Sequence, residues 1–317
     1  MLYNHPMRQY ALFHYPEFTS LSPLIHQAFA KQCQLSIQYT QILTSPEDFP
    51  AVLQQFRQNE GMGANVTKPL KTIAFQLCHK TTVRAQQAQS VNTLYWEGDK
   101  LCGDTTDGEG FIQGLNCYHE INKTHYATRI NTHHFFNQNP FVFQQKKVLL
   151  LGAGGAAAAI LNHIIAQNPH HIYIGNRTIE KGNVLRDRFS QAPITVIEYR
   201  DLQEEMTRAI KDSALPAFDW IINATSIRDP KDFILKREQI KGVHFYDLNY
   251  SSTHSLSPLA QWARDNGSAY VIDGLKMLIA QAAASFKIWH PDECLNPQDV
   301  DVGIKSHLES LGNPSTT

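Results

Sequence analysis

A glycine-rich turn near the middle of the chain is the first group of residues that suggests chemistry. The run Gly152-Ala153-Gly154-Gly155-Ala156-Ala157 fits the pattern G-x-G-x-x-A and follows the apolar letters V-L-L-L. In this pattern the first glycine makes a tight turn, the second lets the backbone approach a pyrophosphate, and the last small residue packs a helix on its strand. The N-terminus of that helix offers N–H groups and a positive dipole to phosphates. The run predicts a dinucleotide site, and a glycine turn that only packs tightly is the alternative.

The residues after the next predicted strand indicate which dinucleotide is bound. An NAD site normally has Asp or Glu about 20 residues beyond the glycines to hold the ribose 2′-hydroxyl, and here Asn176-Arg177-Thr178 occupy that place. A carboxylate would repel a 2′-phosphate, whereas Arg177 can bind it through two charge-assisted hydrogen bonds. Lys181, one helical turn further, adds a second positive charge. We therefore expect NADP rather than NAD, with a solvated helix start as the alternative explanation of both cations.

A second group of polar residues lies in the first third of the chain. Asn65 and Thr67 stand at the end of a short predicted strand, and Lys71 follows about one turn into the next helix. Ligand crevices in α/β sheets form at the carboxyl ends of strands. The segments 90–93 (S-V-N-T) and 103–108 (G-D-T-T-D-G) again place polar residues beside short strands. Alone, these residues are ordinary caps and a surface lysine; together they indicate a polar site.

The elements that must position both groups follow from the alternation of β-branched or aliphatic runs with amphipathic stretches, which favours parallel strands joined by crossover helices. We expect strands at residues 10–13, 35–39, 63–66, 147–151, 171–175, 194–197, 220–222, 244–247 and 270–272. Helices are expected from near Pro23 and Pro46, each after a serine N-cap, and at 156–167, 178–189 and 275–288 as the last long helix. Residues 117–145, rich in Asn, His and Gln, are expected to form a linker.

The composition limits the classes of function. The chain has 317 residues, 42% of them hydrophobic, and a formal net charge of −1, which favours a globular small-molecule enzyme over a nucleic-acid or membrane binder. Its longest predominantly apolar stretch is too short to cross a bilayer. Five scattered cysteines without a C-x-x-C pair argue for reduced thiols in a cytoplasm. His119, His125, His133 and His134 match no compact metal motif, so no metal site is expected.

Taken together, the motifs resemble those of the shikimate dehydrogenase family. The matching blocks occur in the family's order and extend across nearly the whole chain: S-x-S-P at 20–23, G-A-N-V-T at 63–67, V-N-T at 91–93, T-D-G at 106–108, G-A-G-G, N-R-T, N-A-T-S at 223–226, and D-G-L-x-M-L-x-x-Q-A at 273–282. Their joint occurrence is far more specific than any single block.

The resemblance implies NADP-linked interconversion of shikimate and 3-dehydroshikimate, with Lys71 and Asp107 as the catalytic pair. Lys71 would donate a proton during reduction and accept one during oxidation, while Asp107 would orient it and bind a hydroxyl. The implied substrate-binding residues are Ser20 and Ser22 at the carboxylate with Tyr250 nearby, and Asn65, Thr67, Lys71, Asn92, Asp107 and Gln281 at the ring. The implied cofactor-binding residues are Gly152, Ala153, Gly154, Gly155, Ala156, Asn176, Arg177, Thr178, Lys181, Asn223, Ala224, Thr225, Ser226, Leu248, Gly274 and Met277.

The chain also departs from the family's pattern. Leu21 stands where a basic residue is common, Thr105 stands where Asn is common, and Ile227-Arg228 follow N-A-T-S without the expected glycine. These changes fall in loops near the expected substrate carboxylate and nicotinamide. Relaxed substrate or cofactor use, with quinate as a related substrate, and a non-catalytic NADP-binding regulator therefore remain alternatives.

The order of the motifs predicts a two-domain α/β fold. Residues 1–116 and 275–317 are expected to form an α/β substrate-binding catalytic domain completed by the C-terminal helices, and 146–274 a Rossmann-type NADP domain inserted between them. The C-terminal part would return Gln281 to the neighbourhood of Asn65 and Lys71. The expected partner is a small-molecule substrate, and the expected assembly a monomer or homodimer.

Overall fold

The computed structural model describes residues 7–123, 142–213, 217–253 and 256–312, and the chain divides into two compact units. The first unit consists of Met1–Gly110, Ser252–Ser255 and Leu278–Thr317, and the second of Phe111–Ser251 and Leu256–Met277. Two of the boundaries fall inside helices, α5 (Asp107–Lys123) and α11 (Leu275–Trp289). Helix α5 thus continues into the stretch expected to be a linker, whose residues 124–141 lie outside the described part.

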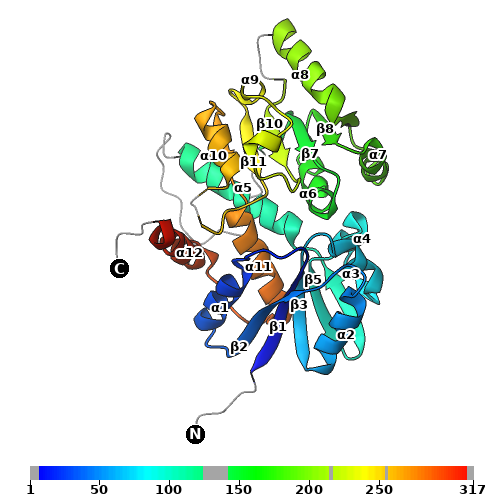
Figure 1. Ribbon diagram of the computed structural model, residues 1–317, viewed down its shortest axis with the longest axis vertical. Coiled ribbons are helices and arrows are strands. Elements are labelled where there is room, and N and C mark those ends of the chain that lie inside the picture. Colours follow the sequence, from blue (N-terminus) through cyan, green and yellow to red (C-terminus); the bar gives the residue numbers. More distant parts are fainter. Residues whose placement is uncertain (1–6, 124–141, 214–216, 254–255, 313–317) are drawn as a thin grey trace. The chain divides into compact units, whose positions relative to one another are not determined.

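The first unit is built on a six-stranded sheet in the order β2-β1-β3-β5-β6-β4 (Figure 1). Its strands are β1 (Arg8–His14), β2 (Ile37–Leu43), β3 (Gly61–Val66), β4 (Lys80–Thr81), β5 (Thr93–Glu97) and β6 (Lys100–Asp104). Strand β5 is antiparallel to both β3 and β6, so the expectation of parallel strands throughout is wrong here. Gly98, at φ +60°, lies between β5 and β6, where two residues reverse the chain and leave no length for a crossover helix.

Alternation along β1 assigns its side chains to two helical layers. Ala11 and Phe13 belong to a buried cluster with residues of α2, α3 and α4, whereas Tyr10 stacks on Trp289 of α11 at 4.6 Å between ring centroids. Successive side chains of a strand point to opposite faces, so helices cover both faces of this sheet. The helices are α1 (Ser22–Gln32), α2 (Phe49–Gln58), α3 (Lys71–Leu77), α4 (Val83–Ala88) and α12 (Pro297–Gly312), together with the part of α11 from Leu278 on.

The helix starts differ from the serine caps expected from the sequence. Ser22 is the first residue of α1, and its cap residue is Leu21. Helix α2 begins at Phe49 with Asp48 as its cap residue, because Ser45 and Asp48 hydrogen-bond each other in the turn before it. Helix α12 (Pro297–Gly312) follows α11, so the expectation that the helix at 275–288 is the last long one is wrong.

The second unit has a parallel sheet in the order β12-β11-β10-β7-β8-β9. Its strands are β7 (Lys147–Leu151), β8 (His171–Asn176), β9 (Ile194–Glu198), β10 (Trp220–Asn223), β11 (His244–Asp247) and β12 (Tyr270–Ile272). Read from β9, this is the order 3-2-1-4-5-6 of doubly wound dinucleotide-binding sheets, with β7 as the first strand. The predicted two-domain Rossmann-type fold is confirmed in this topology.

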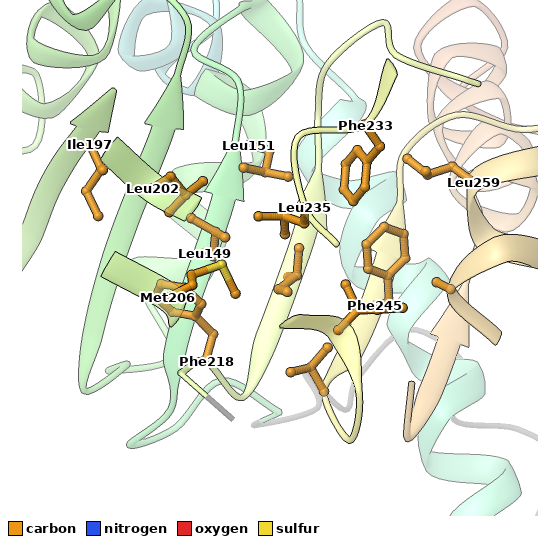
Figure 2. Packing of buried hydrophobic residues seen from close by; sticks show 14 residues of the cluster. Leu149, Leu151, Ile197, Leu202, Met206, Phe218, Phe233, Leu235, Phe245 and Leu259 are labelled. Carbon is orange, nitrogen blue, oxygen red and sulfur yellow. The ribbon is translucent and has the colours of Figure 1, made fainter. Parts of the chain in front are cut away.

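Helices cover both faces of the second sheet. On one face, Leu149, Leu151, Ile221 and Phe245 pack in a cluster with residues of α8, α9 and α10. Figure 2 shows Leu149, Leu151 and Phe245 within this cluster. On the other face, Phe111 of α5 stacks on Tyr246 at 5.1 Å between centroids. The helices of this unit are α6 (Gly155–Ile165), α7 (Ile179–Asp187), α8 (Tyr199–Ser213), α9 (Arg237–Ile240) and α10 (Pro258–Asp265), with a 3-10 turn η1 (Pro230–Asp232).

The end of the expected linker belongs to the second unit's core. Phe143 is fully buried, stacks on Phe111 and packs its edge against Trp220, which confirms that this phenylalanine has a packing role. Phe135, Phe136 and Phe141, for which the same role was expected, lie outside the described residues. No helix in the described ranges is long and apolar enough to cross a membrane.

Candidate active site

An ammonium–carboxylate pair lies at the ends of two elements of the first unit. Lys71 is the first residue of α3, rather than one turn into it, and Asp107 is the first residue of α5 directly after β6. Lys71 Nζ donates to Asp107 Oδ2 at 2.6 Å, and the two side chains are 12% and 2% exposed. Little water screens so buried a pair, so the charges of Lys71 and Asp107 interact more strongly than those of an exposed ion pair.

Asn92 connects this pair to α11. Its Nδ2 donates to Asp107 Oδ1 at 2.9 Å and to Gln281 Oε1 at 3.1 Å. Because Asp107 Oδ1 can only accept while the carboxylate is ionised, this contact fixes which end of the Asn92 amide is nitrogen. Gln281 uses its oxygen for Asn92, so its Nε2 amide is the group it can offer to a ligand as a donor.

Asn65, at the end of β3, presents the opposite character. Its Nδ2 donates to the backbone oxygen of Asn92 at 3.1 Å and to Ser285 Oγ at 3.0 Å, while its Oδ1 accepts from the Tyr39 hydroxyl at 2.8 Å. A backbone carbonyl only accepts, so the orientation of the amide is settled. Both N–H groups are engaged, and the second lone pair of Oδ1 makes Asn65 an acceptor for a ligand hydroxyl.

Ser20 and Ser22 form a buried hydroxyl pair before and at the start of α1. Ser20 Oγ donates to Ser22 Oγ at 3.0 Å and accepts from the Ser22 backbone N–H at 3.1 Å. The N–H of Ser20 donates to Gln41 Oε1 of β2 at 3.2 Å. Leu21 between the serines is buried. Thr67, predicted in the same site, is half-buried, and its backbone N–H donates to Phe13 O.

Sequence reasoning missed several residues of this cluster. Thr93, Thr106 and Ser285 are fully buried and bonded among Asn65, Asn92 and Gln281. Ser285 carried a readable signal, because it lies four residues after Gln281 on an otherwise apolar helix and so shares its face.

Arg84 of α4 holds the turn that leads to Asp107. It makes two parallel hydrogen bonds of 2.7 Å to Asp104, which is 5% exposed, and a further one of 3.1 Å to Glu109. These hydrogen bonds, opposed by partial burial, raise the pKa of Arg84. Thr105, which follows Asp104 in the chain, is buried, and its hydroxyl has no partner within the described residues. Arg84 thus ties the residues on either side of Asp107 to one helix.

The predicted dinucleotide turn lies between β7 and α6 in the second unit. Gly152 has φ +104°, where a side chain would be strained, and its N–H donates to Gly175 O. A Cβ added at Gly154 would meet no atom within 4 Å. Gly154 is also the cap residue of α6 and supplies no side-chain cap to the first N–H groups. Gly155, Ala156 and Ala153 complete the turn, and Ala157 is buried against the sheet, as the motif requires.

The predicted cations stand at the end of β8. Arg177 and Lys181 are exposed, and Asn176 Nδ2 donates to Thr178 O at 2.8 Å, which shapes the turn before α7. Arg177 lies near Tyr199, whose pKa burial raises to about 12 against the opposing effect of this charge. The structure brings both predicted cations to the carboxyl end of the sheet, one strand from the glycine turn.

The loop after β10 is held by a buried carboxylate. Asp247 accepts from Asn223 Nδ2, Asn249 and the Ser257 hydroxyl, and burial raises its pKa despite these donors. Thr225 Oγ1 donates to Asn223 Oδ1 at 2.7 Å. Ala224 follows Asn223 as a buried residue, and Ser226 and Arg228 are exposed.

Gly274 and Leu248 meet backbone to backbone in the second unit. A Cβ on Gly274 would collide with Leu248 O, so only glycine allows this approach before α11. Met277 is buried in the same unit, and Tyr250 lies half-buried in the loop after β11. The structure therefore gathers the predicted cofactor residues in one unit, together with Tyr250, while the other predicted substrate residues belong to the first unit.

These residues fit a bound dinucleotide phosphate. The space beyond Gly154, the uncapped start of α6 and the exposed guanidinium of Arg177 match a pyrophosphate and a 2′-phosphate in shape and charge. Among the residues that the structure describes, no group of three or more His, Cys, Asp or Glu side chains could hold a metal ion.

Fold and site together define a class of α/β proteins that combine a doubly wound unit of the dinucleotide-binding type with a second α/β unit that carries a polar cluster. Family models match at residues 12–94, for the substrate-binding domain of shikimate dehydrogenase, and at 136–247, for shikimate/quinate 5-dehydrogenase. The chain is 36% identical to the NADP+-dependent shikimate dehydrogenase of Colwellia psychrerythraea over 283 residues, 89% of this chain and 90% of that one. It belongs to the shikimate/quinate dehydrogenase family, as its motifs predicted.

Solved structures agree with this assignment. A shikimate dehydrogenase from Aquifex aeolicus has a TM-score of 0.74 at 25% identity, covering 95% of this chain and 99% of that one. The Ael1 enzyme from Pseudomonas putida has a TM-score of 0.71 at 28% identity, covering 93% and 97%. A further shikimate dehydrogenase, solved in complex with NADP+, has a TM-score of 0.73 at 26% identity, covering 95% and 96%.

Proposed function

We propose that this chain catalyses the reversible, NADP-dependent reduction of 3-dehydroshikimate to shikimate, a step of aromatic amino acid biosynthesis. The observation that carries the proposal is the Lys71–Asp107 pair set among Asn65, Asn92 and Gln281, in a chain of this family. A polyhydroxylated ring needs several neutral donors and acceptors, and a carbonyl that receives a hydride needs one proton donor.

Lys71 is the proton donor of the reductive reaction. When bound, NADPH supplies the hydride to the carbonyl carbon. The carbonyl oxygen then takes the Lys71 proton as its charge develops, so the alcohol forms and the lysine is left neutral. Asp107 holds the ammonium in place through the 2.6 Å hydrogen bond and can accept from a ring hydroxyl. In the oxidative direction the neutral amine takes the hydroxyl proton.

The neutral groups around the pair suit the rest of the substrate. The Asn65 carbonyl accepts from a ring hydroxyl and the Gln281 amide donates to one, with Thr67 and Asn92 as further contacts. The hydroxyls of Ser20 and Ser22 bind the carboxylate, and Tyr250 approaches it. Leu21 stands between the two serines, where a basic residue is common in the family, and it is buried. This supports the serine hydroxyls, rather than a cation, as the partners of the carboxylate.

The second unit binds NADP. The turn from Gly152 to Ala156 and the start of α6 hold the pyrophosphate, and Arg177 and Lys181 hold the 2′-phosphate beside Asn176 and Thr178. The segment Asn223–Ser226, the meeting point of Leu248 and Gly274, and Met277 face the nicotinamide half. The exposure of Arg177 and Lys181 supports their availability to a phosphate.

An assay of dinucleotide reduction tests the proposal. The chain is mixed with shikimate or quinate and with NADP+ or NAD+, and absorbance of the reduced cofactor is followed for all four pairs. The highest kcat/KM is expected for shikimate with NADP+. Turnover of quinate at a similar kcat/KM would instead make this a shikimate/quinate dehydrogenase, and NADP binding without any turnover would favour a regulator.

A cytoplasmic location and a monomeric or homodimeric state complete the proposal. Cys33, Cys78, Cys102 and Cys294 are free thiols, which supports a reducing compartment. Sedimentation of the purified chain distinguishes monomer from dimer. The expected partners are small molecules, and unchanged mobility of labelled DNA and RNA on mixing checks the expected absence of nucleic-acid binding.

A further inference from the structure

We propose that Ser285 is a positioning residue, which fixes the Asn65 amide so that its oxygen faces the substrate. This proposal rests on the proposed function, because it assigns the substrate-binding role of Asn65 to a particular orientation of its side chain. Ser285 lies on α11, and its side chain is completely buried.

The Ser285 hydroxyl joins groups from three parts of the first unit's sheet. Its oxygen lies 3.0 Å from Asn65 Nδ2 at the end of β3, 2.7 Å from Thr93 Oγ1 at the start of β5, and 3.2 Å from Thr106 Oγ1 after β6. It also donates to Gln281 O, one turn earlier in α11, at 2.9 Å. One side chain thus connects α11 with the ends of three strands around the candidate active site.

The Ser285 hydroxyl has one proton and two lone pairs, and this limits which groups it can donate to and accept from. A serine hydroxyl donates once and accepts twice, and its proton goes to Gln281 O. Its lone pairs then accept one N–H of Asn65 and the hydroxyl of Thr93 or Thr106. The other Asn65 N–H goes to the Asn92 carbonyl. Ser285 is therefore the partner that uses the second Asn65 N–H group and leaves only the Asn65 oxygen for a ligand.

Removing the hydroxyl loosens this arrangement. In Ser285→Ala the nearest remaining acceptor for that N–H is Thr93 Oγ1 at 3.4 Å, too long for a good hydrogen bond. An amide with an unused donor can rotate and turn that donor toward the site, where it opposes a substrate hydroxyl that must also donate. We expect KM for shikimate to rise roughly tenfold, with a smaller fall in kcat and an unchanged KM for NADP+.

A double-mutant cycle tests the route of the effect. Steady-state kinetics are measured for wild type, Ser285→Ala, Asn65→Ala and the double variant, with thermal denaturation of each. If Ser285 acts through Asn65, its substitution raises KM in the wild-type background and hardly at all in the Asn65→Ala background. Equal increases in both backgrounds, or no increase in either, would overturn the proposal.

Two further variants separate positioning from a loss of stability. Phe29→Leu weakens the packing of Phe29 on Phe286 of α11, where the ring centroids are 5.9 Å apart, without touching the polar cluster. It should lower Tm and leave KM for shikimate unchanged, and a matching rise in KM would count against Ser285. Ser285→Cys keeps the shape of the side chain with a somewhat larger atom that accepts poorly, so it should also raise KM, and it replaces the alanine variant should that one not fold.

A failure of the proposed function can be distinguished from a failure of the proposal about Ser285. Absence of wild-type turnover with shikimate would overturn that function alone. The orientation of Asn65 is then read without substrate, from the side-chain amide signals of the chain labelled with 15N-asparagine, assigned by their loss in Asn65→Ala. Ser285→Ala should shift these signals, whereas Phe29→Leu should not, and an unshifted signal in Ser285→Ala would reject the role of Ser285.

Discussion

Lys71 donates a 2.6 Å hydrogen bond to Asp107 in a nearly buried pair, and its role can be isolated by truncation. Lys71→Ala removes the proposed proton donor, while the neutral groups proposed to bind the ring stay in place. We expect kcat to fall by about three orders of magnitude with little change in KM for shikimate. Lys80→Ala, which breaks an exposed ion pair with Glu97, is the matched control and should keep the wild-type rate. A near-native kcat for Lys71→Ala would contradict the assignment.

Arg177 offers an equally specific prediction for the cofactor. Its exposed guanidinium at the end of β8 should bind the 2′-phosphate, which NAD lacks. Arg177→Ser should raise KM for NADP+ by roughly 10- to 100-fold and leave KM for NAD+ almost unchanged. Arg237→Ser in the same unit removes an exposed arginine paired with Glu238 and should affect neither value. Equal losses with both cofactors would show that Arg177 does not recognise the phosphate.

Residues within motifs could be predicted from the sequence because their chemistry is local. Gly152 needs its positive φ wherever that turn occurs, and Lys71 and Asp107 stand in recognisable blocks. Ser285 and Arg84 could not be assigned in this way. Their partners lie up to 220 residues away for Ser285 and up to 25 for Arg84, and only the packing of α11 and α4 on the sheet brings them together.

Helix α4 shows how one element positions another through a buried charge. Arg84→Met would leave Asp104, which is 5% exposed, without its bidentate partner. Because an unpaired buried carboxylate is costly, we expect a loss of about 3 kcal/mol in the free energy of unfolding and a lower kcat through a displaced Asp107. Lys80→Met breaks an ion pair in which both side chains are about half exposed, and it should change the free energy of unfolding much less, because solvent screens such a pair. Urea denaturation of both variants tests the difference, and equal midpoints would refute it.

Helices and strands could be predicted from the sequence where the pattern of apolar residues was clear. The strands at 147–151, 244–247 and 270–272 have the expected bounds, since buried parallel strands are short apolar runs. Short strands were expected beside residues 90–93 and 103–108, but the antiparallel pairing of β5 with β6 was missed, because its signal is the turn E-G-D-K rather than an apolar run. Helix α12 was missed because the polar residues between its apolar positions Val300, Ile304 and Leu308 resemble a solvated tail.

At the scale of the molecule, two sheets with different topologies perform different tasks. The mixed sheet of the first unit brings polar side chains from β3, β5, β6 and α11 into one cluster. The parallel sheet of the second unit places loops from successive strands at one edge. The chain has a net charge of −1, yet it is proposed to bind an anionic dinucleotide and a substrate carboxylate. The two are compatible, because each anion would be held by charges or hydroxyls within its own site.

The first unit also contains a histidine that should make its stability depend on pH. His26 of α1 is buried and stacks on Tyr39 at 4.3 Å between centroids. Burial lowers its pKa to about 3, and the Asn65 side chain opposes this shift only in part. The unfolded chain therefore binds a proton below about pH 6.5 that the folded chain refuses until about pH 3. Stability is complete above pH 6.5 and falls by about 1.4 kcal/mol for each pH unit below it.

Hydrogen exchange at pH 7, 6 and 5, corrected for the intrinsic exchange rate, measures this loss in peptides from α1. His26→Phe keeps the stacking on Tyr39 but cannot be protonated, so its α1 peptides should lose protection less steeply with acid than those of the wild type. The pKa of His290 is lowered in the same way, to about 4, and accounts for the slope that remains. Peptides from α10 in the second unit serve as the internal control, since His26→Phe should not change their slope. An equal slope in α1 for both proteins would show that His26 is protonated in the folded state.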